Sequence, residues 1–395
     1  MPSSVEGHVA TSSGSTAFKD QIDAALVDRL AIALAVAGPD VDVESFRRVA
    51  VGGLDGRELK ARIAHVASAL ATALPAEFPS AVAVVDRVLT APAEGPDGGP
   101  AGLRGWDLWA VTEWVALAGR DHPGDALELL ARLTRHASGE FAIRPFIDDD
   151  PDGVRVRLTT WVQRDDEHVR RLVSEGTRPK LPWAPKLAIT ATDPAYAVGL
   201  LDRLVDDGSE YVRRSVSNHL NDLCRVDAAL ALEVAGRWTG RADAAAEGGD
   251  EATAAQLRWV VRRGLRTLVK AGDPDAMRLL GHDPDVAVGA ELVVHTPTVV
   301  MGGAAEWTLR LASQDPAPHR IVVDYAIHYV RADGSTGRKV AKWTTVELAP
   351  AQQVELVRRH RIVPITTRTY YSGEHRLEVQ VNGAVVAEGA FHLEV

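Results

Sequence analysis

The chain has 395 residues, a formal net charge of −10 and one cysteine, Cys224. This length suffices for two domains. The single cysteine excludes an internal disulfide framework and fits a reducing cytoplasm. No apolar run approaches the roughly 20 residues that span a bilayer. Residues 1–17 lack a basic start and an apolar core, so they predict a disordered tail and not a signal peptide.

Helical periodicity begins at Phe18 and continues to about Leu89. Apolar residues recur at i, i+3, i+4 and i+7 in segments 26–35 and 59–74, which predicts amphipathic helices. A Pro/Gly-rich loop at 91–102 then precedes a helix that contains three tryptophans. The spacing of these residues favours a buried aromatic stripe over a binding surface. They are Trp106, Trp109 and Trp114.

The helices after about Ala126 look repeated. The strings EHVRRLVSEG (167–176), EYVRRSVSNH (210–219) and WVVRRGLRTL (259–268) align at intervals of roughly 40 residues, which is typical of HEAT-like solenoids. The low-complexity insertion at 240–255 lengthens the second interval and predicts a surface loop. Asp-Pro pairs at 193–194 and 273–274 predict the starts of further helices.

The pattern changes after about Pro284. Short β-rich runs follow, and Asp333-Gly334 and Asn382-Gly383 are hairpin turn dipeptides flanked by alternating residues. About seven strands in a segment of this length predict an immunoglobulin-like sandwich. The expected organisation is therefore an all-α HEAT-like domain at 18–284 followed by a β-sandwich domain at 285–395.

Three carboxylates occupy corresponding places in the repeated helical region. Glu140 begins EFAIRPFI, Glu175 ends a helix between Ser174 and Gly176, and Asp222 shares a helix face with Asn218. The commoner fate of any one such acid is a structural ion pair with an arginine. Three acids on successive repeats favour convergence on one groove.

Positive charge gathers around these acids, despite the negative total. Residues 155–186 hold eight cations and four acids. The pairs Arg170-Arg171 and Arg213-Arg214 fit contacts to a phosphate backbone and a salt-bridge ladder between repeats about equally well. Trp161 and Trp183 can stack on a planar cationic group or pack in a core. No P-loop, HExxH string or cysteine pair is present, so no metal or cofactor is expected.

The strings EFAIRPFI, SEGTRPKLPW and SVSNHLND resemble those of the bacterial AlkC-type DNA glycosylases, which are relatives of AlkD. The resemblance covers about Phe18 to His282, and the β-rich tail resembles the immunoglobulin-like domain that one AlkC subgroup carries. It implies a HEAT-like enzyme of base excision repair, which removes cationic N-alkylated bases such as 3-methyladenine and 3-methylcytosine without flipping the damaged nucleotide into a pocket. The catalytic acids of the family carry over onto Glu140, Glu175 and Asp222.

The expected partner is double-stranded DNA with alkylated bases, bound by a monomer in the bacterial cytoplasm at the nucleoid. A non-enzymatic HEAT scaffold that binds DNA or protein is the alternative. In the β region, cations near a hairpin fit either phosphate contacts or a solvated face. The residues expected to contact DNA are Arg144, Trp161, Arg170, Arg171, Arg178, Lys180, Trp183, Arg213, Arg214, Asn218, His219, Arg262, Arg263, Arg338 and Lys339.

Overall fold

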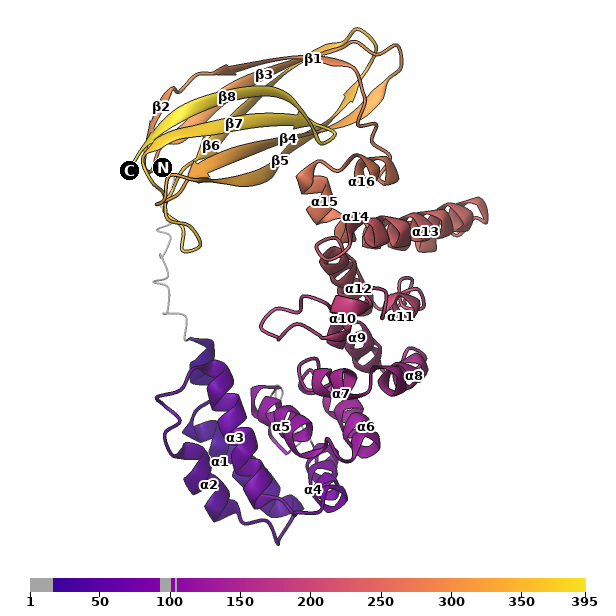
Figure 1. Ribbon diagram of the computed structural model, residues 1–395, viewed down its shortest axis with the longest axis vertical. Helices are drawn as coiled ribbons and strands as arrows, with labels where there is room; N and C mark the ends of the chain where they lie inside the picture. Colours follow the sequence, from indigo (N-terminus) through magenta and orange to yellow (C-terminus); the bar gives the residue numbers. More distant parts are fainter. Residues whose placement is uncertain (1–16, 93–100, 104) are drawn as a thin grey trace, which may run out of the picture. The chain divides into compact units, whose positions relative to one another are not determined.

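The computed structural model describes residues 17–92, 101–103 and 105–395 (Figure 1). These residues form two compact units, of which the first ends at Ser215 and the second begins at Val216. The predicted tail at 1–17, apart from Ala17, and most of the predicted loop at 91–102 lie outside the described residues.

The first unit is helical. Its short helices follow one another along the chain as in the predicted repeat (Figure 1). They are η1 (Phe18–Gln21), α1 (Ala24–Ala37), α2 (Val43–Val51), α3 (Leu59–Ala73), α4 (Phe78–Thr90), α5 (Gly105–Ala118), α6 (Pro123–Leu133), α7 (Arg144–Asp149), α8 (Pro151–Trp161), α9 (Glu167–Gly176), α10 (Ile189–Thr192) and α11 (Val198–Leu201).

The second unit contains the remaining helices and all eight described strands. The helix α12 (Glu210–Leu223) crosses the boundary between the units. The other elements are α13 (Ala228–Glu247), α14 (Glu251–Gly264), α15 (Arg266–Ala271), α16 (Pro274–Leu279), β1 (Val288–Val294), β2 (Thr298–Val300), β3 (Ala304–Ser313), β4 (His319–Val330), β5 (Thr336–Leu348), β6 (Gln353–Arg361), β7 (Gly373–Val381) and β8 (Ala384–Glu394).

Aspartate side chains begin many of these helices. Each accepts a hydrogen bond from a backbone N–H of the first turn, which would otherwise lack a partner. Asp273 does so for α16, as its Asp-Pro pair predicts, whereas Asp193 follows α10 and begins a turn instead. The aspartates that cap helices in this way are Asp23, Asp42, Asp150, Asp166, Asp227, Asp250 and Asp273.

The predicted register of the repeat agrees with burial. Val169, Val212 and Val261 hold the same place in the three strings, and all three are buried. The prediction of a surface loop at 240–255 is wrong, because α13 and α14 continue through the insertion and only three residues separate them. Alanine-rich sequence favours helix, and Asp250 caps the second helix through Thr253 N.

The strands form a three-stranded sheet in the order β1-β3-β6 and a five-stranded sheet in the order β2-β8-β7-β4-β5. All pairs are antiparallel except β2 with β8. Trp307, Tyr325 and Phe391 are fully buried in the core of this immunoglobulin-like domain. The two predicted hairpin turns are confirmed, since Gly334 and the Asn382-Gly383 pair adopt positive φ between paired strands.

The last helices pack directly against this domain. The backbones of Gly272 and Gly383 approach so closely that a Cβ on Gly272 would lie 2.4 Å from Gly383 O. The side chain of Asn382 donates to Asp283 O at 2.7 Å and accepts from Val322 N at 2.8 Å. Compactness therefore divides the chain at 215/216, while the expected domain boundary at 284/285 stays a prediction.

Within the described ranges, no single helix is long and apolar enough to cross a membrane, and α3 with α4 reaches that size only as a pair bent by 113°.

Candidate active site

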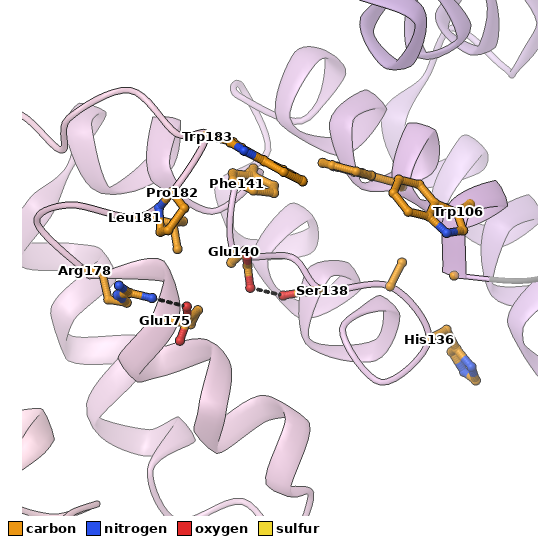
Figure 2. A pocket seen from close by; sticks show the side chains of 13 residues that line it. Trp106, His136, Ser138, Glu140, Phe141, Glu175, Arg178, Leu181, Pro182 and Trp183 are labelled. Atoms are coloured by element: carbon orange, nitrogen blue, oxygen red, sulfur yellow. Dashed lines mark hydrogen bonds and ion pairs between the residues drawn. The ribbon is translucent and has the colours of Figure 1, made fainter. Parts of the chain in front are cut away.

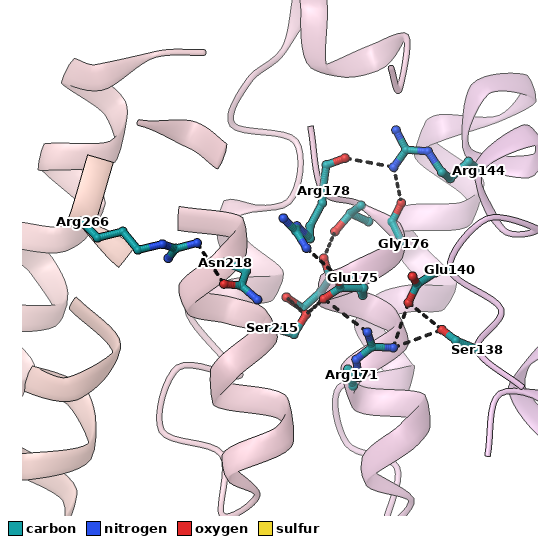
Figure 3. Close-up of polar contacts among 12 residues, drawn as sticks. Ser138, Glu140, Arg144, Arg171, Glu175, Gly176, Arg178, Ser215, Asn218 and Arg266 are labelled. Carbon is teal, nitrogen blue, oxygen red and sulfur yellow. Dashed lines mark hydrogen bonds and ion pairs between the residues drawn. The ribbon is translucent and has the colours of Figure 1, made fainter. Parts of the chain in front are cut away.

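The carboxylate of Glu140 lies in the segment between α6 and α7. Its Oε2 accepts a hydrogen bond from Ser138 Oγ at 2.7 Å and pairs with Arg171 Nη1 at 2.9 Å. The side chain is 15% exposed, so it is largely sheltered but open on one side. Figure 3 shows these contacts at the end of a longer polar network.

Glu175 lies in the last turn of α9 and is more deeply buried. Its Oε1 pairs with Arg178 Nη1 at 2.6 Å, and its Oε2 accepts from Ser215 Oγ at 2.5 Å (Figure 3). Burial alone would raise the pKa of this carboxyl, but the charges of Arg171 and Arg178 and the hydrogen bond from Ser215 outweigh burial and lower it. Glu175 is therefore a carboxylate that the fold keeps ionised.

Arg171 joins the two acids. Its guanidinium lies 2.9 Å from Glu140 Oε2 and 3.7 Å from Glu175 Oε2, and it also stacks 4.8 Å from the centre of the Tyr211 ring. Arg171 was expected to contact DNA, as was Arg178, yet in this structure both pair with the acids. Two carboxylates and two guanidiniums thus balance each other's charge here.

The prediction that Arg144 contacts DNA is wrong. Its guanidinium is buried, and it donates to the carbonyl oxygens of Gly176 at 3.0 Å, Arg178 at 2.9 Å and Pro185 at 2.9 Å. A side chain that is used in this way cannot reach a phosphate. It fixes both ends of the segment 177–186, which follows Glu175.

That segment presents a tryptophan to solvent. Trp183 is 56% exposed and has φ of +67°, a conformation that bulky residues rarely adopt. Its exposure agrees with the predicted stacking role, whereas Trp161 is fully buried in α8, and the prediction that it stacks on a ligand is wrong. The sequence does not separate these two tryptophans, because burial depends on the tertiary fold.

A cleft of about 660 Å³ brings the acids and the tryptophan together (Figure 2). Its aromatic walls include Trp106, Trp109 and Phe141, which the sequence did not identify as site residues. Of the three tryptophans in α5 only Trp114 is fully buried, so the predicted aromatic stripe is wrong for the other two. The full lining is Gly105, Trp106, Trp109, His136, Ala137, Ser138, Glu140, Phe141, Glu175, Arg178, Leu181, Pro182 and Trp183.

Two further residues of the first unit that were expected to contact DNA instead bind other parts of the protein. Arg170 forms a bidentate ion pair with Asp207, at 2.6 and 3.0 Å, as in the predicted salt-bridge ladder. Arg213 donates to the backbone oxygen of the same aspartate. Lys180 and Arg214 are exposed, and Arg214 also pairs with Glu210 at 2.5 Å.

Asp222 lies on the part of α12 that belongs to the second unit and is 2% exposed. Its convergence with the two glutamates stays a prediction. On the same helix, Asn218 Oδ1 accepts from Arg266 Nη2 at 3.1 Å (Figure 3), and His219 is buried, so this histidine has no surface to offer DNA.

The expected contacts farther along the second unit differ in exposure. Arg262 and Arg263 of α14 and Lys339 of β5 are exposed. Arg338 is half-buried and pairs with Glu378 at 3.0 Å. Among the residues that the structure describes, no group of three or more histidine, cysteine or acidic side chains is placed to hold a metal ion.

Comparisons with known proteins match most of the chain. Residues 289–395 match the family model for the C-terminal Ig-like domain of the uncharacterised protein YhaZ. The YhaZ protein of Bacillus subtilis (strain 168) is 30% identical over 328 residues, which are 83% of this chain and 85% of YhaZ. The solved structure of Pseudomonas fluorescens alkylpurine DNA glycosylase AlkC, bound to DNA containing an abasic site analog, is 31% identical with a TM-score of 0.84. That match covers 96% of this chain and 100% of the solved chain.

Proposed function

The chain belongs to the family that includes AlkC and YhaZ, and we propose that it is a DNA glycosylase that hydrolyses the N-glycosidic bond of N-alkylated bases. The observation that carries this proposal is the pair Glu140 and Glu175, which Arg171 joins by ion pairs in one cleft with aromatic walls. The expected substrates are cationic bases in double-stranded DNA, with 3-methyladenine and 3-methylcytosine as representatives.

The chemistry explains why carboxylates suffice. Alkylation of a ring nitrogen makes the base cationic, so it leaves without protonation by a general acid. The sugar then develops positive charge at C1′ and its ring oxygen. A fixed carboxylate stabilises that charge in a sheltered cleft, where electrostatic interactions are stronger than in water. No metal, cofactor or lysine nucleophile is required for such a monofunctional hydrolysis.

The proposed division of labour follows from the environments of the acids. Glu175 is buried and ionised, so it suits electrostatic stabilisation of the sugar, and Glu140 is the more open of the two glutamates. Asp222 positions and deprotonates the attacking water. The damaged base stays stacked in the DNA duplex and is not flipped into a pocket. The enzyme acts as a monomer in the cytoplasm.

Arg171 and Arg178 offset the negative charge of the two glutamates. Two uncompensated carboxylates would repel the phosphate backbone, but Arg171 and Arg178 neutralise them in the absence of DNA. Phosphate contacts then fall to cations that are exposed to solvent. We assign that role to Lys180, Arg214, Arg262, Arg263 and Lys339, which are all exposed.

The test is release of free bases from methylated double-stranded DNA. Glu175→Gln and Asp222→Asn remove a charge but keep size and hydrogen-bonding capacity. We expect each to lower the rate of 3-methyladenine release by about 100-fold or more, as is typical when an electrostatic stabiliser is lost. Circular dichroism and DNA affinity should stay close to those of the wild type.

The matched control is Glu233→Gln, which removes an exposed carboxylate that is ion-paired with Arg237 on α13. It should leave base release unchanged. If the wild type binds methylated DNA but releases no base, or if both site variants retain full activity, the proposal fails and a non-enzymatic DNA-binding scaffold becomes the better account.

A further inference from the structure

One part of the cleft is not used by the acids, namely a run of aromatic rings along its rim. Trp109 stacks on Phe141 with 5.5 Å between ring centres and touches Trp106 at 5.4 Å. Trp183 contributes an indole from the segment 177–186, and Figure 2 shows Trp106 and Trp183 on opposite sides of the cleft. Both of these indoles are accessible rather than buried in the core.

Both of these indoles contact a third ring, that of Phe18. The phenyl group of Phe18 lies 6.0 Å from the centre of Trp106, nearly parallel to it, and 6.0 Å from Trp183, edge-on. Phe18 is itself 61% exposed and belongs to η1, at the beginning of the described chain. A phenyl side chain this exposed contributes little to a core, yet it contacts both indoles, one by stacking and the other edge-on.

The fold also maintains this slot at a cost. A tryptophan with φ of +67° is strained, and such strain concentrates where function requires it. The three backbone hydrogen bonds from Arg144 hold the segment that carries Trp183 in this conformation. An arrangement that only packed the cleft would not need an exposed indole in a strained backbone.

We propose that Trp106 and Trp183 form a stacking slot for the released N-alkylated nucleobase, and that Phe18 occupies this slot until the base is freed. This inference rests on the proposed function. The slot belongs to the same cleft as Glu140 and Glu175, so a base that leaves the sugar there meets the two indoles next. Alkylated purines are planar and electron-poor, and they stack well on indole faces.

The consequence is product inhibition that depends on aromatic residues and not on the acids. Free 3-methyladenine should bind the DNA-free protein in equilibrium dialysis and should inhibit base release. Trp106→Leu and Trp183→Leu should each weaken that binding by about tenfold, the size of one lost base-stacking contact. Phe18→Ala should tighten it by about threefold, because the base no longer displaces a ring.

The control is Leu117→Ala, which removes an exposed apolar side chain from the same helix as Trp106, outside the cleft lining. It should not change the affinity. Tighter binding by Phe18→Ala cannot arise from misfolding, so this variant keeps the test decisive even if a tryptophan variant folds poorly.

The outcomes separate the two proposals. If the wild type releases bases but neither it nor Phe18→Ala binds free 3-methyladenine at millimolar concentration, the slot is refuted and the enzyme assignment stands. Unchanged affinity in both tryptophan variants would refute the slot as well. Binding of the free base without any release from methylated DNA would support the slot and refute the glycosylase.

Discussion

At the scale of single residues, Arg171 is the largest of the influences that keep Glu175 ionised, beside Arg178 and Ser215. The pKa of this carboxyl is lowered from 4.5, so the group stays charged as the pH falls to 4.5 and is protonated only below that value. Its favourable contribution to stability is accordingly present above pH 4.5 and is lost as the pH falls through the lowered pKa. Removal of the Arg171 guanidinium, the largest cause that lowers this pKa, should therefore raise it, because burial acts in that direction and only Arg178 and Ser215 still oppose it.

We therefore expect Arg171→Gln to move the acidic limb of the pH–rate profile for base release to higher pH. The measurement is the single-turnover rate on methylated DNA across the acidic range, corrected for spontaneous base loss. Arg132→Gln is the matched control, since it breaks an exposed bidentate pair between Arg132 of α6 and Asp86 of α4, neither of which lines the cleft. A profile that coincides with the wild type would show that Arg171 does not set the charge of Glu175.

Single residues also show how much of the site can be predicted from the sequence. Glu140 and Glu175 could be singled out because their strings resemble those of a known family and because both acids lie in the region of repeated helices. The ion-pair and hydrogen-bond partners of each charged side chain could not be predicted from the sequence, because they depend on the tertiary fold. Arg144 and Trp161 are residue types that often contact DNA, but the fold buries both. Trp106 has the spacing of a core residue, yet it lines the cleft.

At the scale of elements, the segment 177–186 owes its conformation to one buried cation. Without the guanidinium of Arg144, three carbonyl oxygens would lose their donor. Hydrogen bonds from charged donors contribute about 1.5–3 kcal/mol each. Arg144→Met should therefore lower the free energy of unfolding by about 3 kcal/mol and loosen the segment.

Limited trypsin digestion measures that loosening directly. Lys180 and Lys186 are exposed cleavage sites within the segment, and both should be cut faster in Arg144→Met than in the wild type. Arg155→Met, which breaks an exposed pair with Asp152 on α8, should digest at the wild-type rate. Equal digestion of all three proteins would mean that the segment does not depend on Arg144.

Helices and strands were easier to predict than the connections between them. The repeated strings located α9, α12 and α14, and turn dipeptides located two hairpins, because both signals can be read directly from short stretches of sequence. The insertion at 240–255 was mistaken for a loop, since low complexity resembles disorder while its alanines favour helix. Local composition alone could not decide between these two effects.

At the scale of the whole molecule, the second unit joins helices to an immunoglobulin-like domain through backbone contacts. Gly272 follows α15 and Gly383 lies in the turn between β7 and β8, and neither position has room for a side chain. The sequence did not predict this contact between Gly272 and Gly383, because each glycine is also typical of an isolated turn. The predicted change from helix to strand is correct, yet compactness does not separate the last helices from the strands.

Gly272→Ala tests that junction. The added methyl group would lie 2.4 Å from Gly383 O, a backbone atom that cannot move aside without shifting its hairpin. The control is Gly249→Ala, where φ is +83° compared with +82° for Gly272, but no atom lies within 4 Å. Both variants incur the backbone strain of about 1 kcal/mol, and only Gly272→Ala adds an overpacking cost of about 1–3 kcal/mol. Urea unfolding should therefore show a larger loss for Gly272→Ala, and equal losses would mean that the two glycines do not lock the helices to the β domain.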